Sequence, residues 1–255
     1  VPNDPAAAAV LDLPRETATA QLRAIFALLD LGHAEAATSL LDDLAASDVS
    51  DQQKAALVDH YGTARFLRLL RQTGPGGVAE LPAGREFVAA TLQAASDRAR
   101  DPERLAQALA QLAEAGPGRR NAQKQLVAAG EAGIVAAVAR LADDPPGDVR
   151  AALLETLAAM RPTVHQPLIA LLAESQGALR RDATRLAGRL GLLEALPWIA
   201  VQSIGAAGEQ NQKVAHDALA AMDLPRPTPA EAAALVRHRL ADLSSAPNPG
   251  YGSSL

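Results

Sequence analysis

Apolar side chains recur every three or four residues along most of this chain, which is the spacing that places them on one face of an α-helix. The pattern runs from Leu22 to Gly32 and begins again at Ala36. Residues 50–53, Ser-Asp-Gln-Gln, have the spacing of a capping box, which predicts a helix from there to about Tyr61. Ala, Leu and Val supply most apolar positions and aromatic residues make up only 2 %, which favours helices packed closely on helices. The pattern therefore predicts an all-α fold.

Glycine and proline divide the chain into parts. The Gly-Pro-Gly-Gly sequence at 74–77 is the strongest internal break. The hairpins before it loosely resemble tetratricopeptide repeats, through Leu31-Gly32 and the small Ala positions. We therefore expect, in order, an N-terminal extended segment (1–14), tetratricopeptide-like or irregular helical hairpins (15–73), a connecting helical hairpin (82–117), a repeat region with a C-terminal capping helix (118–243), and a disordered tail or linker (244–255).

The middle of the chain repeats itself with a period near 30 residues. A basic residue, one further residue and Ala open a helix at Arg120, Arg150, Arg181 and Lys213, so the successive spacings are 30, 31 and 32 residues. A second apolar segment follows these starts. A period of this length is typical of stacked helical hairpins, in which each hairpin covers the apolar face of its neighbour.

Two stretches of this region resemble a known repeat. Gly147 to Leu153 and Ala178 to Gly191 are similar to the short HEAT-like repeat first described in phycobilisome lyases, and the likeness covers residues 118 to about 222. The resemblance implies a right-handed α-α superhelix (solenoid) of antiparallel hairpins, HEAT/ARM-like. Lys213 in place of Arg indicates a degenerate capping repeat at the end. The whole chain also resembles HEAT-repeat regions at the front of larger, often exported bacterial proteins of unassigned role.

Charge is distributed unevenly along the chain. The formal net charge is −5, yet residues 1–60 carry 3 basic and 10 acidic side chains, whereas residues 61–120 carry 9 and 6. This balance argues against nucleic acid held by a broad basic surface. The sequence has no Cys, which removes disulfides, thiolate metal sites and a cysteine nucleophile. No apolar run reaches the roughly 18 residues that a membrane span requires.

Arginines supply two candidate interaction sites. Arg65, Arg68 and Arg71 recur every three residues on one side of a helix, where they form either a solvated face or a site for an anionic partner. The second set repeats at one position in each hairpin. This inter-repeat ladder consists of Arg120, Asp148, Arg150, Arg181, Asp182 and Lys213. It predicts hydrogen bonds between neighbouring hairpins or, alternatively, a basic groove for phosphate or acidic peptide.

The second helices of a helical-repeat solenoid tend to line its concave side. His165, Gln166, Trp198 and Gln202 lie on these helices and are the candidate partner-binding residues. Trp198, the only Trp of the chain, is either an exposed anchor or buried between repeats. No histidine pair, nucleophile elbow or phosphate-binding glycine loop meets the structural conditions of its chemistry, so the sequence predicts no catalytic residue, no metal site and no cofactor.

The sequence therefore predicts a non-catalytic scaffold that binds a protein or peptide on the concave face of a solenoid. Three alternatives stay open: a HEAT-like nucleic-acid-binding protein or glycosylase, a bilin lyase or chromophore chaperone suggested by the repeat type, and a structural spacer or self-assembly module. The oligomeric state is open as well. The start at Val1 fits both signal cleavage and an internal boundary, so export and a cytoplasmic location are both open.

Overall fold

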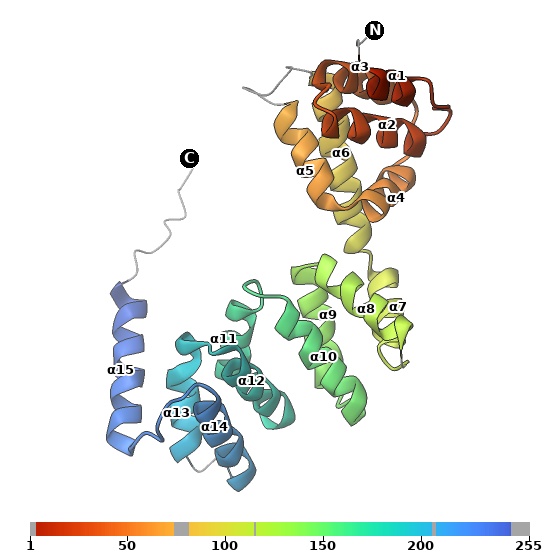
Figure 1. Ribbon diagram of the computed structural model, residues 1–255. Coiled ribbons are helices and arrows are strands. Elements are labelled where there is room, and N and C mark those ends of the chain that lie inside the picture. The colour runs from red at the N-terminus through yellow and green to blue at the C-terminus, as the bar shows by residue number, and fades with distance from the viewer. Residues whose placement is uncertain (1–3, 74–81, 115, 206–207, 246–255) are drawn as a thin grey trace, which may run out of the picture. The chain divides into compact units, whose positions relative to one another are not determined.

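The structure of the protein is a computed structural model that describes residues 4–73, 82–114, 116–205 and 208–245 (Figure 1). Within these ranges every regular element is a helix and no strand occurs, which confirms the all-α prediction. The chain folds into two compact units, residues 1–104 (the N-terminal unit) and residues 105–255 (the C-terminal unit). Helix α7 (Pro102–Gln111) begins three residues before the boundary between them and continues into the C-terminal unit.

The N-terminal unit is a bundle closed by its last helix. Its helices are α1 (Pro5–Leu11), α2 (Ala18–Asp30), α3 (Ala34–Ala45), α4 (Asp51–Tyr61), α5 (Thr63–Gln72) and α6 (Pro82–Ala99). Helix α6 packs against α3, α4 and α5, and α2 packs against α1 and α3. The expectation of a connecting hairpin over 82–117 is not met by α6, because its Phe87 and Val88 belong to the core of the preceding helices. The expected break at 74–77 lies outside the described residues.

The first described residues are helical, in contrast to the extended segment expected over 1–14. The side chain of Asp4 accepts a hydrogen bond from the backbone N–H of Ala6 (2.8 Å), which caps α1. Pro5 occupies the first turn, where the helix needs no N–H donor. Four consecutive Ala then favour the helix, and burial of Ala7 fixes it on the bundle.

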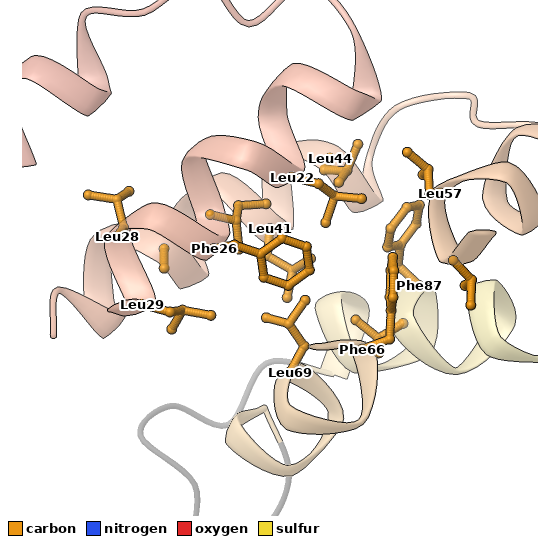
Figure 2. Close-up of a cluster of buried hydrophobic side chains, with 14 of the residues drawn as sticks. Leu22, Phe26, Leu28, Leu29, Leu41, Leu44, Leu57, Phe66, Leu69 and Phe87 are labelled. Atoms are coloured by element: carbon orange, nitrogen blue, oxygen red, sulfur yellow. The ribbon is translucent and has the colours of Figure 1, made fainter. Parts of the chain in front are cut away.

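Large apolar side chains form the core of the N-terminal unit, and Figure 2 shows them converging from α2, α3, α4, α5 and α6. The rings of Phe26 and Phe66 meet edge to face with their centroids 5.9 Å apart, and the ring of Tyr61 lies 5.1 Å from that of Phe26. The hydroxyl of Tyr61 donates a hydrogen bond to the carbonyl of Thr19 (2.6 Å). The aromatic contacts therefore join α2, α4 and α5 through side chains distant in sequence.

Helices of the C-terminal unit succeed one another in chain order in Figure 1. They are α8 (Pro117–Ala128), α9 (Glu131–Ala142), α10 (Gly147–Ala159), α11 (His165–Glu174), α12 (Gly177–Leu190), α13 (Leu196–Ile204, after a 3-10 turn at Leu193–Ala195), α14 (Glu209–Ala221) and α15 (Pro229–Ser245). Helix α10 packs against α8 and α12, α12 against α11 and α14, and α13 against α14 and α15. The principal contacts therefore join helices that are near neighbours in sequence.

Small residues allow close helix crossings in this unit. A Cβ atom added at Gly188 of α12 would lie 2.6 Å from the Cα of Ala218 in α14, and one added at Gly133 of α9 would lie 2.0 Å from the carbonyl oxygen of Leu126 in α8. Real Cβ contacts are longer than this, so the two backbones meet where a side chain is absent. Leu and Ala fill most of the remaining core.

Candidate functional site

A groove with a volume of about 890 Å³ lies between α9 and α11 in the C-terminal unit. We call it the α9–α11 groove. Its α9 wall consists of Glu131, Ile134, Val135, Val138 and Ala139. These positions share one face of the helix over slightly more than two turns, which corresponds to about 12 Å of helix length. The groove is therefore long enough to receive about two turns of another helix.

The α9 wall offers apolar surface to solvent. Val135 is 69 % exposed, the largest exposed fraction among the large apolar side chains of the described residues. Its neighbour Ile134 is only 2 % exposed and fixes α9 against the core. Burying an exposed valine against a partner removes apolar surface from water, which is favourable in proportion to the area covered.

The opposite wall comes from α11 and the turn before it. Pro162 and Thr163 form the turn, and Gln166, Ala170 and Leu171 continue the wall along the helix. Gln166 is exposed, whereas Leu171 is half-buried. The groove thus combines an apolar surface with an amide that both donates and accepts hydrogen bonds.

Both charged residues that line the groove are glutamates. Glu131 lies in the first turn of α9 and Glu174 is the last residue of α11, and both are exposed. Within the described residues neither carboxylate takes part in an ion pair. The lining contains no Lys, Arg or His.

Three arginines lie near lining residues in sequence, and each makes contacts of its own. Arg140 lies 3.6 Å from the carboxylate of Asp143, Arg161 donates to the carbonyl of Leu190, and Arg180 donates to the carbonyl of Ala173 (3.3 Å). In these contacts the guanidinium groups interact with acceptors other than the carboxylates of Glu131 and Glu174. The groove therefore carries uncompensated negative charge.

Of the four predicted partner-binding residues, only Gln166 lines the groove. Gln202 is 5 % exposed, and its side chain accepts a hydrogen bond from the hydroxyl of Thr184 (2.8 Å) and donates one to the carbonyl of Asn211 (3.3 Å). Gln202 is therefore not exposed on the surface of the C-terminal unit. A glutamine amide at a helix junction satisfies polar groups of α12 and α14, so it is buried with them.

Trp198 and His165, two other predicted partner-binding residues, are both half-buried. Trp198 is half-buried, and the guanidinium carbon of Arg239 in α15 lies 5.8 Å from its ring centroid, a distance that permits a cation–π contact. Packing of α15 on α13 therefore covers part of the expected anchor. His165 is half-buried at the start of α11, and its Nε2 atom is buried without a hydrogen-bond partner.

Sequence reasoning misses Val135, which contributes most to the exposed apolar surface. On α9, Ile134 and Leu141 are buried in the core, whereas Val135, the residue after Ile134, is exposed. Consecutive residues of a helix point about 100° apart, and α9 buries Ile134 but leaves Val135 exposed. Because the adjacent Phe87 and Val88 of α6 are both buried, the Ile134-Val135 pair by itself does not indicate which side chain faces outward.

The three arginines of α5, Arg65, Arg68 and Arg71, are exposed, and two of them contact other residues of the N-terminal unit. Arg65 lies over the ring of Phe26 at 5.3 Å from its centroid, and Arg68 pairs with Asp30 at 2.8 Å. Arg71 is exposed in the last turn. Arg65 and Arg68 therefore contact residues of their own unit. A site for an anionic partner at these three arginines stays a prediction.

Polar side chains form contacts from α8 to α10 and from α10 to α12. Arg119 of α8 lies 3.5 Å from Asp148 of α10, and Arg150 of α10 pairs with Asp182 of α12. Asp182 is 1 % exposed and also pairs with Arg185 at 3.0 Å. The ladder thus uses Arg119 where Arg120 was expected, because Arg120 lies on the exposed side of α8.

The last contact of the series differs from the expected ladder. Arg181 of α12 donates a hydrogen bond to the side-chain oxygen of Asn211 in α14 (3.4 Å). Lys213 is exposed two residues further along α14. Asn211 precedes Lys213 by slightly more than half a helical turn, and its side chain, not that of Lys213, contacts Arg181 of α12.

Comparison with protein families and with curated proteins gives no match for this chain. Among the described residues no helix is long and apolar enough to cross a membrane. The same residues include no group of three or more His, Cys, Asp or Glu side chains placed to hold a metal ion.

Proposed function

We propose that the C-terminal unit is a solenoid of HEAT-like hairpins and that it binds a protein or peptide in the α9–α11 groove without catalysing a reaction. The order of packing supports the solenoid, because α8, α10, α12 and α14 contact one another in sequence, as do α11, α13 and α15. The polar contacts from Arg119 to Asn211 repeat along the same series of helices.

The exposed apolar surface around Val135 is the observation that carries the binding proposal. Grooves between neighbouring helices are a common way to bind an amphipathic helix, whose apolar side chains enter at every third or fourth position. The lining favours a peptide over nucleic acid, since it has no Lys or Arg to neutralise phosphate.

A peptide selection tests this proposal. A displayed library of helical peptides is selected on the full chain, and binders are then measured against Val135→Asn. Because Val135 is exposed, the substitution leaves the fold intact while it removes apolar contact area. We expect binding to weaken by about fivefold, the effect of losing roughly 1 kcal/mol of apolar burial.

The matched control is Leu193→Asn, which changes an apolar side chain that is 62 % exposed in the same unit and lies outside the groove. Binding to this variant should equal that of the unchanged chain. Selection that yields no peptide sensitive to Val135→Asn would disprove the binding proposal.

A further inference from the structure

The charges of the α9–α11 groove indicate the chemistry of its partner. We propose that the groove takes a short basic amphipathic helix, with apolar side chains against Val135 and its neighbours and Lys or Arg beside Glu131 and Glu174. This inference rests on the proposed function, because it names the partner of the same groove.

Electrostatics support a basic partner. Glu131 and Glu174 are the charged residues of the lining, and the three arginines near lining residues in sequence interact with Asp143 and with two backbone carbonyls. A cationic side chain of the partner would meet carboxylates that no ion pair within the described residues neutralises. An acidic partner would meet repulsion at the same two positions.

The shape of the walls supports a helix. Lining residues of α9 and of α11 recur at three- and four-residue intervals, so each wall is a ridge along its own helix. A third helix fits between two such ridges when its apolar residues follow the same spacing. The α9 wall extends for about 12 Å, which corresponds to roughly eight residues of a partner helix.

Three designed peptides test the inference on the full chain. The first has leucines at helical spacing flanked by lysines, the second has the same leucines flanked by glutamates, and the third has the composition of the first without the periodicity. Each carries a fluorophore, and binding is followed by fluorescence anisotropy. We expect the basic helical peptide to bind at least about tenfold more tightly than either of the others.

The double variant Glu131→Gln, Glu174→Gln identifies the cause of that preference. It should reduce the difference between the basic and acidic peptides to about threefold or less, since only the charge at the groove changes. Glu155→Gln is the matched control, because Glu155 is an exposed carboxylate on α10 outside the groove. That variant should keep the full preference.

The possible outcomes separate the two proposals. Peptides that lose affinity with Val135→Asn but do not distinguish lysine from glutamate would overturn the basic partner and leave the peptide-binding function in place. Binding that depends on neither Val135 nor the glutamates would overturn both. Sedimentation that shows self-association abolished by Val135→Asn would identify a second copy of the chain as the occupant and also overturn the inference.

Discussion

The two units of this protein achieve their packing by different means. The N-terminal unit contains all three Phe residues of the chain and builds its core around their rings. The C-terminal unit has a core of Leu and Ala, with Gly at the closest helix crossings and Arg–Asp pairs between successive helices. Large side chains therefore organise a closed bundle, whereas small ones let helices that are near neighbours in sequence pack closely.

The difference also affects where each unit exposes apolar surface. In the bundle, α6 covers helices α3, α4 and α5 together, because Phe87 and Val88 reach the common core. In the C-terminal unit the principal packing joins near neighbours in sequence, and α9 and α11 leave a groove between them. The groove thus lies where no later helix of the described residues covers the facing sides of α9 and α11.

Among the substitutions considered, Phe66→Ala should lower the free energy of unfolding the most, and it should do so in the N-terminal unit. Phe66 is fully buried, so its loss leaves a cavity that lowers the free energy of unfolding by about 3–5 kcal/mol. Hydrogen exchange measured by mass spectrometry should rise in α2 to α6 and stay unchanged in α8 to α14. The neighbouring Leu67 is 53 % exposed, and Leu67→Ala should change little. Equal effects of the two substitutions would contradict an aromatic core.

Gly188→Ala should destabilise the C-terminal unit. The new Cβ would lie 2.6 Å from the backbone of Ala218, which forces α12 and α14 apart at a cost of about 3 kcal/mol. Trp198 lies in this unit, so its fluorescence during urea unfolding measures the change. Gly147→Ala is the control, since a Cβ there meets nothing within 4 Å. It should be neutral or slightly stabilising.

Asp182→Ala should weaken the contact between successive hairpins. Asp182 is 1 % exposed and pairs with Arg150 and Arg185, and losing these charged hydrogen bonds should lower the free energy of unfolding by about 2 kcal/mol. The exposed pair of Arg140 and Asp143 provides the comparison, so Asp143→Ala should cost less than about 0.5 kcal/mol. Urea unfolding that ranks the two variants in reverse order would contradict a structural ladder.

The smallest effect concerns the pH dependence of α1. The hydrogen bond between Nε2 of His33 and Asp4 (2.8 Å) lowers the pKa of Asp4 below its ordinary value of 3.8. A lowered pKa stabilises the docked helix above pH 3.8, and this stabilisation is lost as the pH falls through the folded-state pKa. The Ala7 methyl resonance should therefore shift below pH 3.8 in the unchanged chain and much less in Asp4→Asn. A shift of equal size in both would contradict this role of Asp4.

Local rules explain what the sequence predicts correctly. Helical periodicity identifies the all-α fold, and the capping box at Ser50 is present in the structure, because these features depend on residues a few positions apart. Arg150 of α10 pairs with Asp182 of α12, 32 residues further along the chain. The same rules do not indicate that α6 joins the bundle before it.

What the sequence determines by itself is the helical periodicity and the caps, since each depends on spacing along the chain. Only the tertiary structure decides that Gln202 is buried, that Arg119 instead of Arg120 reaches Asp148, and that Val135 faces a groove. These outcomes depend on which side of a helix its neighbours cover. That choice is made by packing among helices distant in sequence, and a rotation of one residue, about 100° around a helix, reverses it.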